Sequence, residues 1–199
     1  MNKVLPMIFV SFLICSCGNT IYTYHFEKQK NIDFSSGKWI LNEPYTNNGD
    51  HRIKDISVKR FEEILKDSLY EINELRKDKL VGTSFPFEPS HKDLRDFQIA
   101  TGCDYLINIK SNIVKDEMGS FAHAPNIGST KKTNQAESEI RFYDLNKLTL
   151  LSKWTIIGKA EIIKNADDGS WDYVNTGKTI SWNGLNKLIG KINKNKVRP

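Results

Sequence analysis

Residues 136–162 read AESEIRFYDLNKLTLLSKWTIIGKAEI, and this stretch decides the fold. Its first part, from Ala136 to Tyr143, alternates small or apolar side chains with charged or polar ones. Because successive side chains of a strand point to opposite faces, this period of two indicates a half-buried strand. Residues 144–147 (DLNK) have the composition of a tight turn, and residues 150–162 repeat the alternation. The stretch therefore predicts an antiparallel β-hairpin.

Three other stretches have the apolar spacing of amphipathic helices. The first is expected to begin after Ser57, a good N-cap residue, and to run to Ile72. The second opens at Ser90, with Asp93 completing a capping box, and ends at Gly102, a residue that favours the left-handed helix end. The third has the apolar stripe Trp182, Leu185, Leu188, Ile189 and Ile192. Each helix is expected to bury one face.

Short apolar stretches between these helices predict the remaining strands, at residues 38–41, 79–81 and 105–109, the last running on as far as residue 114. The resulting order is β-α-β-α-β-β-β-α, in which strand–helix–strand steps favour parallel pairing. We therefore expect an α/β (α+β) fold, a mixed sheet of about five strands with three packed helices. The chain of 199 residues has room for one such domain, placed at residues 38–199.

The N-terminus has the layout of a secretory signal. Lys3 supplies a positive charge, residues 4–14 form an apolar run too short for a permanent membrane span, and small Ser16 precedes Cys17. Residues 14–17 (ICSC) resemble a bacterial lipobox, in which an aliphatic residue stands three places before an invariant cysteine. This resemblance implies cleavage before Cys17, a lipid on its thiol and an acylated new N-terminus. We expect a lipoprotein signal peptide at residues 1–16 and a lipidated N-terminus and tether at residues 17–37.

Alternatives stay open for these segments. The N-terminal segment could be an ordinary signal peptide, which shares the general layout, or a buried strand with no targeting role. Part of the tether could instead be an edge strand, because Ile21, Tyr22, Tyr24 and Phe26 are unusually apolar for a linker. Gly18 follows the cysteine, so the aspartate that retains some lipoproteins in the inner membrane is absent. The expected location is therefore the cell envelope, at the periplasmic face of the outer membrane.

Charge gives no sign of a nucleic-acid partner. The formal net charge is +5, and acidic residues are mixed with basic ones through most of the chain. The one-sided segment is the C-terminal one, with Lys187, Lys191, Lys194, Lys196 and Arg198. A nucleic-acid surface would need clustered basic residues with interleaved aromatic ones, whereas lysines at a helix C-terminus are ordinarily solvated and favour the helix dipole. We expect no nucleic-acid partner.

The sequence has no strong pattern for catalysis or metal binding. Its four histidines lack metal-ligand spacing; they are His25, His51, His91 and His123. Residues 167–170 (DDGS) lack the alternating ligands of a calcium loop, and no nucleophile elbow or phosphate-binding loop occurs. Cys103 is the one cysteine left after signal removal and lipidation, and we expect it to be a small buried side chain. We therefore expect a protein that is not an enzyme and that uses no metal or cofactor.

Two phrases carry a family resemblance, ATGCDYLI at residues 100–107 and RFYDLNKL at residues 141–148. Together with the element order, they resemble the domain shared by lipoprotein activators of penicillin-binding proteins, the curli-secretion lipoprotein and the N-terminal part of the Tol-system propeller protein. The resemblance covers about residues 38–195. It implies a domain that binds other envelope proteins and holds no active site, and it carries over no contact residue.

Candidate binding residues lie in two loops expected at residues 115–134 and 165–177. Long loops on a rigid sheet are often functional. The first contains Phe121 and His123 within an apolar cluster, and the second adds Trp171 and Tyr173, residue types favoured at interfaces. The alternative for Phe121 and Trp171 is that they cover the sheet edge or fill the core.

These features together predict a non-enzymatic lipoprotein, anchored in the membrane by lipid on Cys17, that docks an envelope protein through the two loops. The alternative is a lipoprotein that binds a small ligand or glycan in a pocket between sheet and loops. A concave pocket lined by Tyr105, Trp154 or Trp182 would favour the ligand, and a convex loop surface would favour the protein partner.

Overall fold

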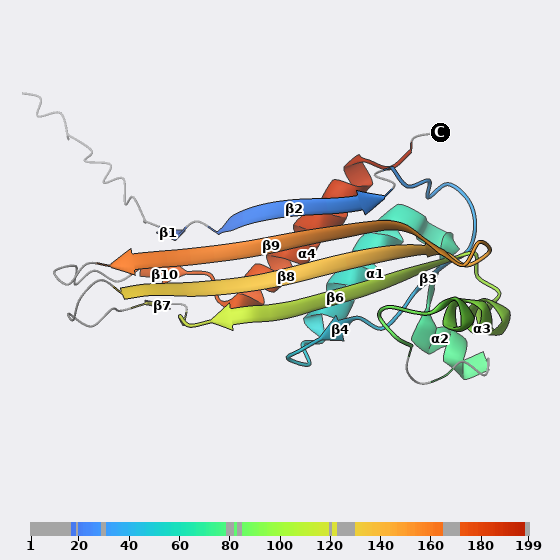
Figure 1. Cartoon of the computed structure of the whole chain (residues 1–199), viewed down its shortest axis with the longest axis horizontal. Helices are drawn as coiled ribbons and strands as arrows, with labels where there is room; N and C mark the ends of the chain where they lie inside the picture. The colour runs from blue at the N-terminus through green and yellow to red at the C-terminus, as the bar shows by residue number, and fades with distance from the viewer. Residues whose placement is uncertain are drawn as a thin grey trace, which may run out of the picture.

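The expected hairpin is the centre of the structure (Figure 1). The computed structural model describes residues 17–18, 20–28, 31–78, 82, 85–119, 121–122, 130–164 and 172–197, so the expected signal peptide lies outside it. β8 (Thr130–Asp144) pairs antiparallel with β9 (Thr149–Lys164). Ile140 and Phe142 are fully buried, whereas Arg141 between them is only half-buried, as the alternation predicts. The Asp144 carboxylate accepts the backbone N–H of Lys147 at 2.9 Å and stabilises the turn.

Among the described residues, seven strands form one mixed sheet in the order β2-β9-β8-β6-β3-β5, with β4 beside β6. The strands outside the hairpin are β2 (Ile21–Lys28), β3 (Trp39–Leu41), β4 (Tyr45–Thr46), β5 (Leu69–Glu71) and β6 (Tyr105–Asp116). β3 is parallel to β5 and β6, whereas β6, β8, β9 and β2 alternate in direction. The mixed α+β sheet is confirmed, and it has more strands than the five expected.

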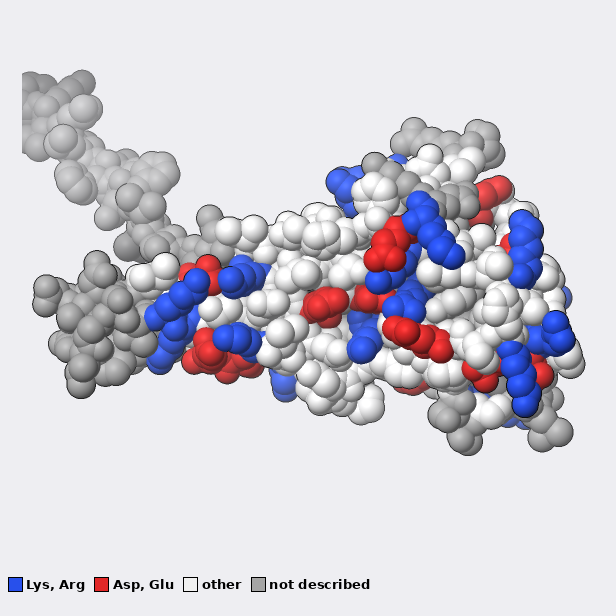
Figure 2. Space-filling view, in the orientation of Figure 1, with Lys and Arg blue, Asp and Glu red and all other residues white. Residues whose placement is uncertain are grey.

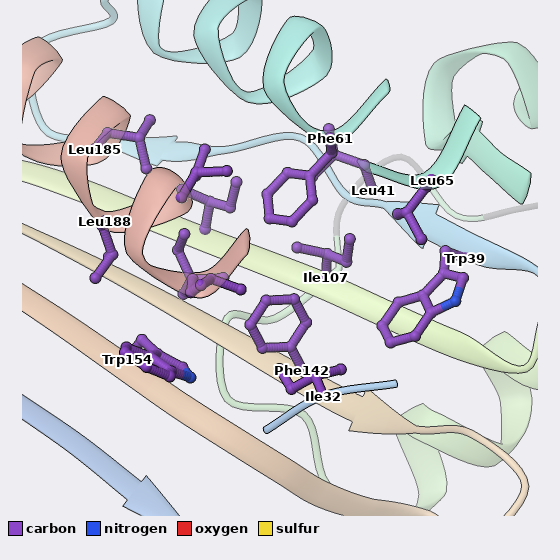
Figure 3. Packing of buried hydrophobic residues seen from close by; sticks show 14 of the residues in the cluster. Ile32, Trp39, Leu41, Phe61, Leu65, Ile107, Phe142, Trp154, Leu185 and Leu188 are labelled. Atoms are coloured by element: carbon purple, nitrogen blue, oxygen red, sulfur yellow. The ribbon is translucent and has the colours of Figure 1, made fainter. Parts of the chain in front are cut away.

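The α-helices in the described part of the chain are α1 (Arg52–Leu65), α2 (Ile72–Asp78), α3 (His91–Thr101) and α4 (Gly177–Lys194). α1 and α4 cover one face of the sheet, behind the strands in Figure 1. The main core lies between them and the sheet. Figure 3 shows its members Phe61, Leu185, Leu188, Ile107, Phe142 and Trp154. Each such side chain contributes about 1.5–3 kcal/mol by leaving water.

A second core lies on the opposite face, at the end of the sheet near α3. Leu106 and Tyr143 point there and pack with Leu94 and Phe97 of α3. Cys103 belongs to this cluster and is buried, as expected. The sheet is therefore covered on both faces at this end.

The first helix differs from the expectation at both ends. α1 begins at Arg52, and Ser57 lies buried within it, where its hydroxyl donates to the Ile53 carbonyl at 2.7 Å instead of capping the helix. α1 ends at Leu65 because Lys66 has a positive φ of 51° and starts a 3-10 turn, Lys66–Ser68. The chain then forms β5, which pairs with β3. The strand expected at residues 79–81 lies outside the described residues.

The two later helices are confirmed. Ser90 and Asp93 form the capping box at the start of α3, with the Asp93 backbone N–H 3.2 Å from the Ser90 hydroxyl and the Ser90 N–H 2.8 Å from the Asp93 carboxylate. Gly102 ends the helix at φ 66°, a conformation that glycine adopts without strain. In α4 the expected apolar stripe is buried except for Trp182, which is half-buried.

β2 is an edge strand formed by part of the segment expected as a tether. It pairs with β9 along its whole length, from Ile21 opposite Lys159 to Lys28 opposite Ser152. The edge-strand alternative is therefore the one that the structure adopts. The polypeptide that follows β2 also joins the fold, since Ile32 and Phe34 are buried in the main core.

Lysines of α4 cover the helix-facing side of β2. The Lys187 ammonium lies 5.3 Å from the ring centre of Tyr22, and the Lys191 ammonium lies 5.5 Å from that of Tyr24. Cation–π contacts of this kind hold a helix against an aromatic strand. These two C-terminal basic residues thus have a structural role.

Candidate functional site

The expected loop at residues 115–134 is shorter than predicted. β6 continues to Asp116 and β8 begins at Thr130, so the irregular loop prediction is wrong at both ends. The physical reason is that β6 and β8 keep pairing past a bulge at Ile113, up to Asp116 opposite Asn134. In the second expected loop, Asp172–Val174 forms strand β10.

A second, small sheet brings predicted site residues together. β1 (Cys17–Gly18), β10 and β7 (Phe121–Ala122) form it in the order β1-β10-β7. Cys17 is opposite Tyr173 in the parallel pair, and Tyr173 is opposite Phe121 in the antiparallel one. The other two predicted residues, His123 and Trp171, lie outside the described residues. The predicted lipid attachment residue and two predicted binding residues therefore meet at one end of the molecule, far from α3 (Figure 1).

Buried polar groups attach the described parts of both loops to the long sheet. Asn134 is fully buried, and its amide donates to the carbonyls of Met118 at 2.8 Å and Asn175 at 3.0 Å. The Asp116 carboxylate accepts the backbone N–H of Gly177 at 2.9 Å. Met118, another apolar residue of the first loop segment, is buried against the sheet.

Four exposed apolar side chains lie at the end of the molecule that holds the small sheet. We call these four residues the loop-end patch. They are Ile21, Val114, Ile163 and Tyr173, and their side chains are 71%, 50%, 66% and 50% exposed. Strand register places the first three at the same end of the long sheet. Ile21 is opposite Lys159, Ile163 is opposite Lys131, and Val114 lies in the bulge next to Lys115, which is opposite Gln135. Val114 and Ile163 occupy positions that the alternation assigns to polar residues. An apolar residue at a position where the alternation predicts a polar one is the sequence signal that could have identified Val114 and Ile163.

Ion pairs join several charged residues beside the loop-end patch. The Glu161 carboxylate forms ion pairs with the ammonium groups of Lys159, at 2.6 Å, and Lys131, at 2.9 Å. Their hydrogen bonds lower the pKa of the Glu161 carboxyl to about 2. Lys115 and Glu117 form another pair at 3.4 Å. Figure 2 shows basic and acidic residues interspersed on the sheet face turned away from α1 and α4. The electrostatics of this end are therefore close to balanced.

A cleft of about 410 Å³ lies between α1 and α4. Its lining residues are Arg52, Ile56, Lys59, Arg60, Glu63, Trp182, Asn183 and Asn186. Of the aromatic residues considered for a ligand pocket, Trp182 lines this cleft and Trp154 is buried in the core. Tyr105 lines a smaller hollow of about 170 Å³ beside the hairpin turn. The sequence alone does not indicate the cleft, because its cations belong to the polar face of α1 and charged residues are expected on the polar face of any amphipathic helix.

Among the described residues, no group of three or more histidine, cysteine or acidic side chains is arranged to hold a metal ion. No helix in this part of the chain has both the length and the hydropathy to cross a membrane.

No protein-family model and no curated protein matches the chain. Solved structures similar to it include the PelC dodecamer from Paraburkholderia phytofirmans (TM-score 0.49, 8% identity, 89% of this chain and 100% of that one). They also include lipoprotein GNA1162 from Neisseria meningitidis (0.35, 11%, 67% and 87%) and a homolog of a neuraminyllactose-binding hemagglutinin from Helicobacter pylori (0.43, 10%, 84% and 89%). With TM-scores below 0.5, these overlaps assign neither a family nor an activity.

Proposed function

We propose that the chain is a lipid-anchored protein of the bacterial cell envelope that docks an envelope protein partner through its loop end. The single observation that carries the proposal is the register of the small sheet, with Cys17 opposite Tyr173 and Tyr173 opposite Phe121. A lipid on Cys17 then holds the loop end beside the bilayer. The partner is a protein that is embedded in the membrane or lies on its surface.

The loop-end patch has the chemistry of a protein interface. Exposed aliphatic and aromatic side chains gather there, and aromatic residues are enriched at interface centres. Bilayer binding by electrostatics would instead need unpaired clusters of basic residues. Lys131 and Lys159 already share Glu161, which reduces their attraction for anionic lipid. The patch is therefore better suited to an apolar protein surface than to lipid headgroups.

The remaining parts of the proposal rest on the sequence. Lipid attachment follows from the lipobox-like residues 14–17, and Gly18 favours the periplasmic face of the outer membrane. Membership of the envelope-protein-binding domain family follows from the phrases at residues 100–107 and 141–148. A non-enzymatic role agrees with a patch made of Ile, Val and Tyr side chains, which supply neither a nucleophile nor an acid–base pair at neutral pH.

The experiment is site-specific photo-crosslinking of the full-length, lipidated protein in living cells. A photoreactive residue at Ile163 is expected to crosslink a discrete envelope protein. The matched control is Ile99 on α3, which is equally apolar, 76% exposed and far from the loop end. Crosslinks from Ile163 to lipid alone, or identical protein products from both positions, would overturn docking at the loop end.

A further inference from the structure

The cleft between α1 and α4 has an excess of positive charge. Arg52, Lys59 and Arg60 line it from α1, and Glu63 is the one acidic residue in the lining. Arg52 is also the first residue of the 14-residue helix α1, where the helix dipole adds partial positive charge. The lining therefore favours an anionic group.

Arg52 is held in place by an aromatic ring. Its guanidinium carbon lies 4.1 Å from the ring centre of Trp182. The indole N–H of Trp182 donates to the Asp50 carboxylate at 2.6 Å, which fixes the ring. Stacking leaves the in-plane N–H donors of a guanidinium available, and the described residues supply no hydrogen bond or ion pair to this side chain. Arg52 is thus positioned and still able to bind a carboxylate or phosphate through two parallel hydrogen bonds.

Arg60 forms the second fixed cation of the cleft. Its Nε donates to the Asn186 side chain at 2.6 Å and its Nη1 donates to Glu63 at 2.8 Å. Eight residues along a helix separate Arg52 from Arg60, which is about 12 Å at 1.5 Å per residue. Lys59 lies between them, and no ion pair involves it among the described residues. Cations distributed over this distance suit an extended ligand with more than one anionic group.

The other lining residues indicate a ligand with hydroxyl groups. The side-chain amides of Asn183 and Asn186 supply N–H donors, and the Asn186 oxygen, which accepts from Arg60, has a second lone pair that a ligand hydroxyl can use. Ile56 and the part of the Trp182 ring that Arg52 leaves uncovered add apolar surface that can contact the carbon face of a sugar ring. The volume of about 410 Å³ lies within the usual range for ligand sites.

We propose that this cleft binds an acidic oligosaccharide, whose carboxylates or phosphates pair with Arg52, Lys59 and Arg60. Trp182 and the two asparagines contact the sugar rings. Binding here is independent of docking at the loop end, because no residue of the loop-end patch lines the cleft.

The test is isothermal titration calorimetry on the protein carrying residues 18–199. The probes are a tetragalacturonate, a phosphorylated oligosaccharide, a neutral oligosaccharide of equal length and inorganic phosphate. The expected result is binding of the carboxylated probe, the phosphorylated probe or both, with an affinity that falls as salt rises. The two acidic probes identify which anionic group the site prefers.

Variants locate the binding in the cleft. Arg52→Gln is expected to weaken binding about 10-fold or more, because it removes a charge-assisted hydrogen-bonding group. Lys59→Gln is expected to weaken it less, and Lys194→Gln, which removes the same charge from α4 outside the cleft, is expected to leave it unchanged. Thermal unfolding checks that each variant is folded.

Several outcomes would overturn the proposal. Equal affinity for the neutral oligosaccharide would remove the role of the cations. Inorganic phosphate that binds as tightly as the oligosaccharides would remove the role of the sugar. Failure of all four probes to bind, or equal losses in the Lys59 and Lys194 variants, would show that the cleft is not the site.

Discussion

The hydroxyls of Ser111 and Ser181 lie 2.7 Å apart in the buried interface between β6 and α4. The Ser111 hydroxyl also lies 2.6 Å from that of Ser138 on β8, so one side chain joins two strands and a helix. Buried hydroxyls cost free energy when they lose their partners. This small polar group therefore fixes how α4 lies on the sheet.

Ser111→Ala is expected to lower the free energy of unfolding by about 1–3 kcal/mol, because two buried hydroxyls lose their common partner. Chemical denaturation monitored by circular dichroism measures the change. Ser36→Ala, at an exposed position, is the control and should change stability by less than about 0.5 kcal/mol. A Ser111 variant as stable as the control would show that the three hydroxyls do not stabilise the interface.

Gly158→Ala is expected to destabilise the contact of β2 and α4 with β9. A Cβ at this position would meet Ile180 of α4 and would lie 2.7 Å from the Tyr22 ring. Overpacking of this kind typically costs about 1–3 kcal/mol. Gly190→Ala in α4 is the opposite case, because nothing lies within 4 Å of the added methyl group. It should raise the melting temperature, and a Gly158 variant that also raised it would contradict the close packing of β2.

The pKa of Glu161 is expected to be far below the usual value of 4.5, at about 2, because Lys159 and Lys131 stabilise its carboxylate. A lowered folded-state pKa means that the ion pairs stabilise the protein above the unfolded pKa and that this contribution is lost as pH falls from about 4.5 towards 2. Carbon-13 NMR of the side-chain carboxyl measures the titration. In Lys159→Gln the pKa should rise towards 4.5, and an unchanged midpoint would show that Lys159 has no effect on it.

Cys17→Ala is expected to leave an unlipidated precursor, because lipid attachment and cleavage both require the thiol at this position. Metabolic labelling with an alkyne fatty acid, followed by electrophoresis, measures both effects. Cys15→Ala is the matched control and should be labelled and cleaved normally. Normal labelling of the Cys17 variant would make the lipobox interpretation wrong.

Combined Phe121→Ala and Trp171→Ala substitutions are expected to reduce capture of the envelope partner at least about 10-fold, the effect of losing one typical interface anchor. Quantitative mass spectrometry of proteins retained from detergent-solubilised envelope measures the loss. The control is Ile99→Ala at the opposite end. Unchanged partner capture by the double variant would separate these two residues from the interface.

Local chemistry allowed parts of this fold to be predicted. The alternation from Ala136 to Tyr143 describes the hairpin because each strand has one buried and one polar face. The Ser90 capping box and Gly102 mark both ends of α3 through backbone hydrogen bonds and a left-handed residue. In such elements the residues that decide the structure are neighbours in the sequence.

The remaining parts depend on contacts between distant segments. Leu69 continues the apolar spacing of α1, yet it belongs to β5, because pairing with β3 overrides helix periodicity. The meeting of Cys17, Tyr173 and Phe121 joins three separate segments, and no local pattern indicates it. The cleft has the same origin, since Arg52 and Trp182 come from opposite ends of the domain sequence.

The position of β2 determines how the protein bears mechanical load. A pull on a lipid at Cys17 first loads the pairing of β1 with β10 and then reaches β2, which begins at Ile21. β2 pairs with β9 over eight residues, at the edge of the long sheet (Figure 1). Hydrogen bonds of an antiparallel pair run across the strands, so a pull along β2 strains the whole set together and does not open the bonds one after another. A protein tethered in this way can resist a pull from the membrane along β2 while its sheet stays intact.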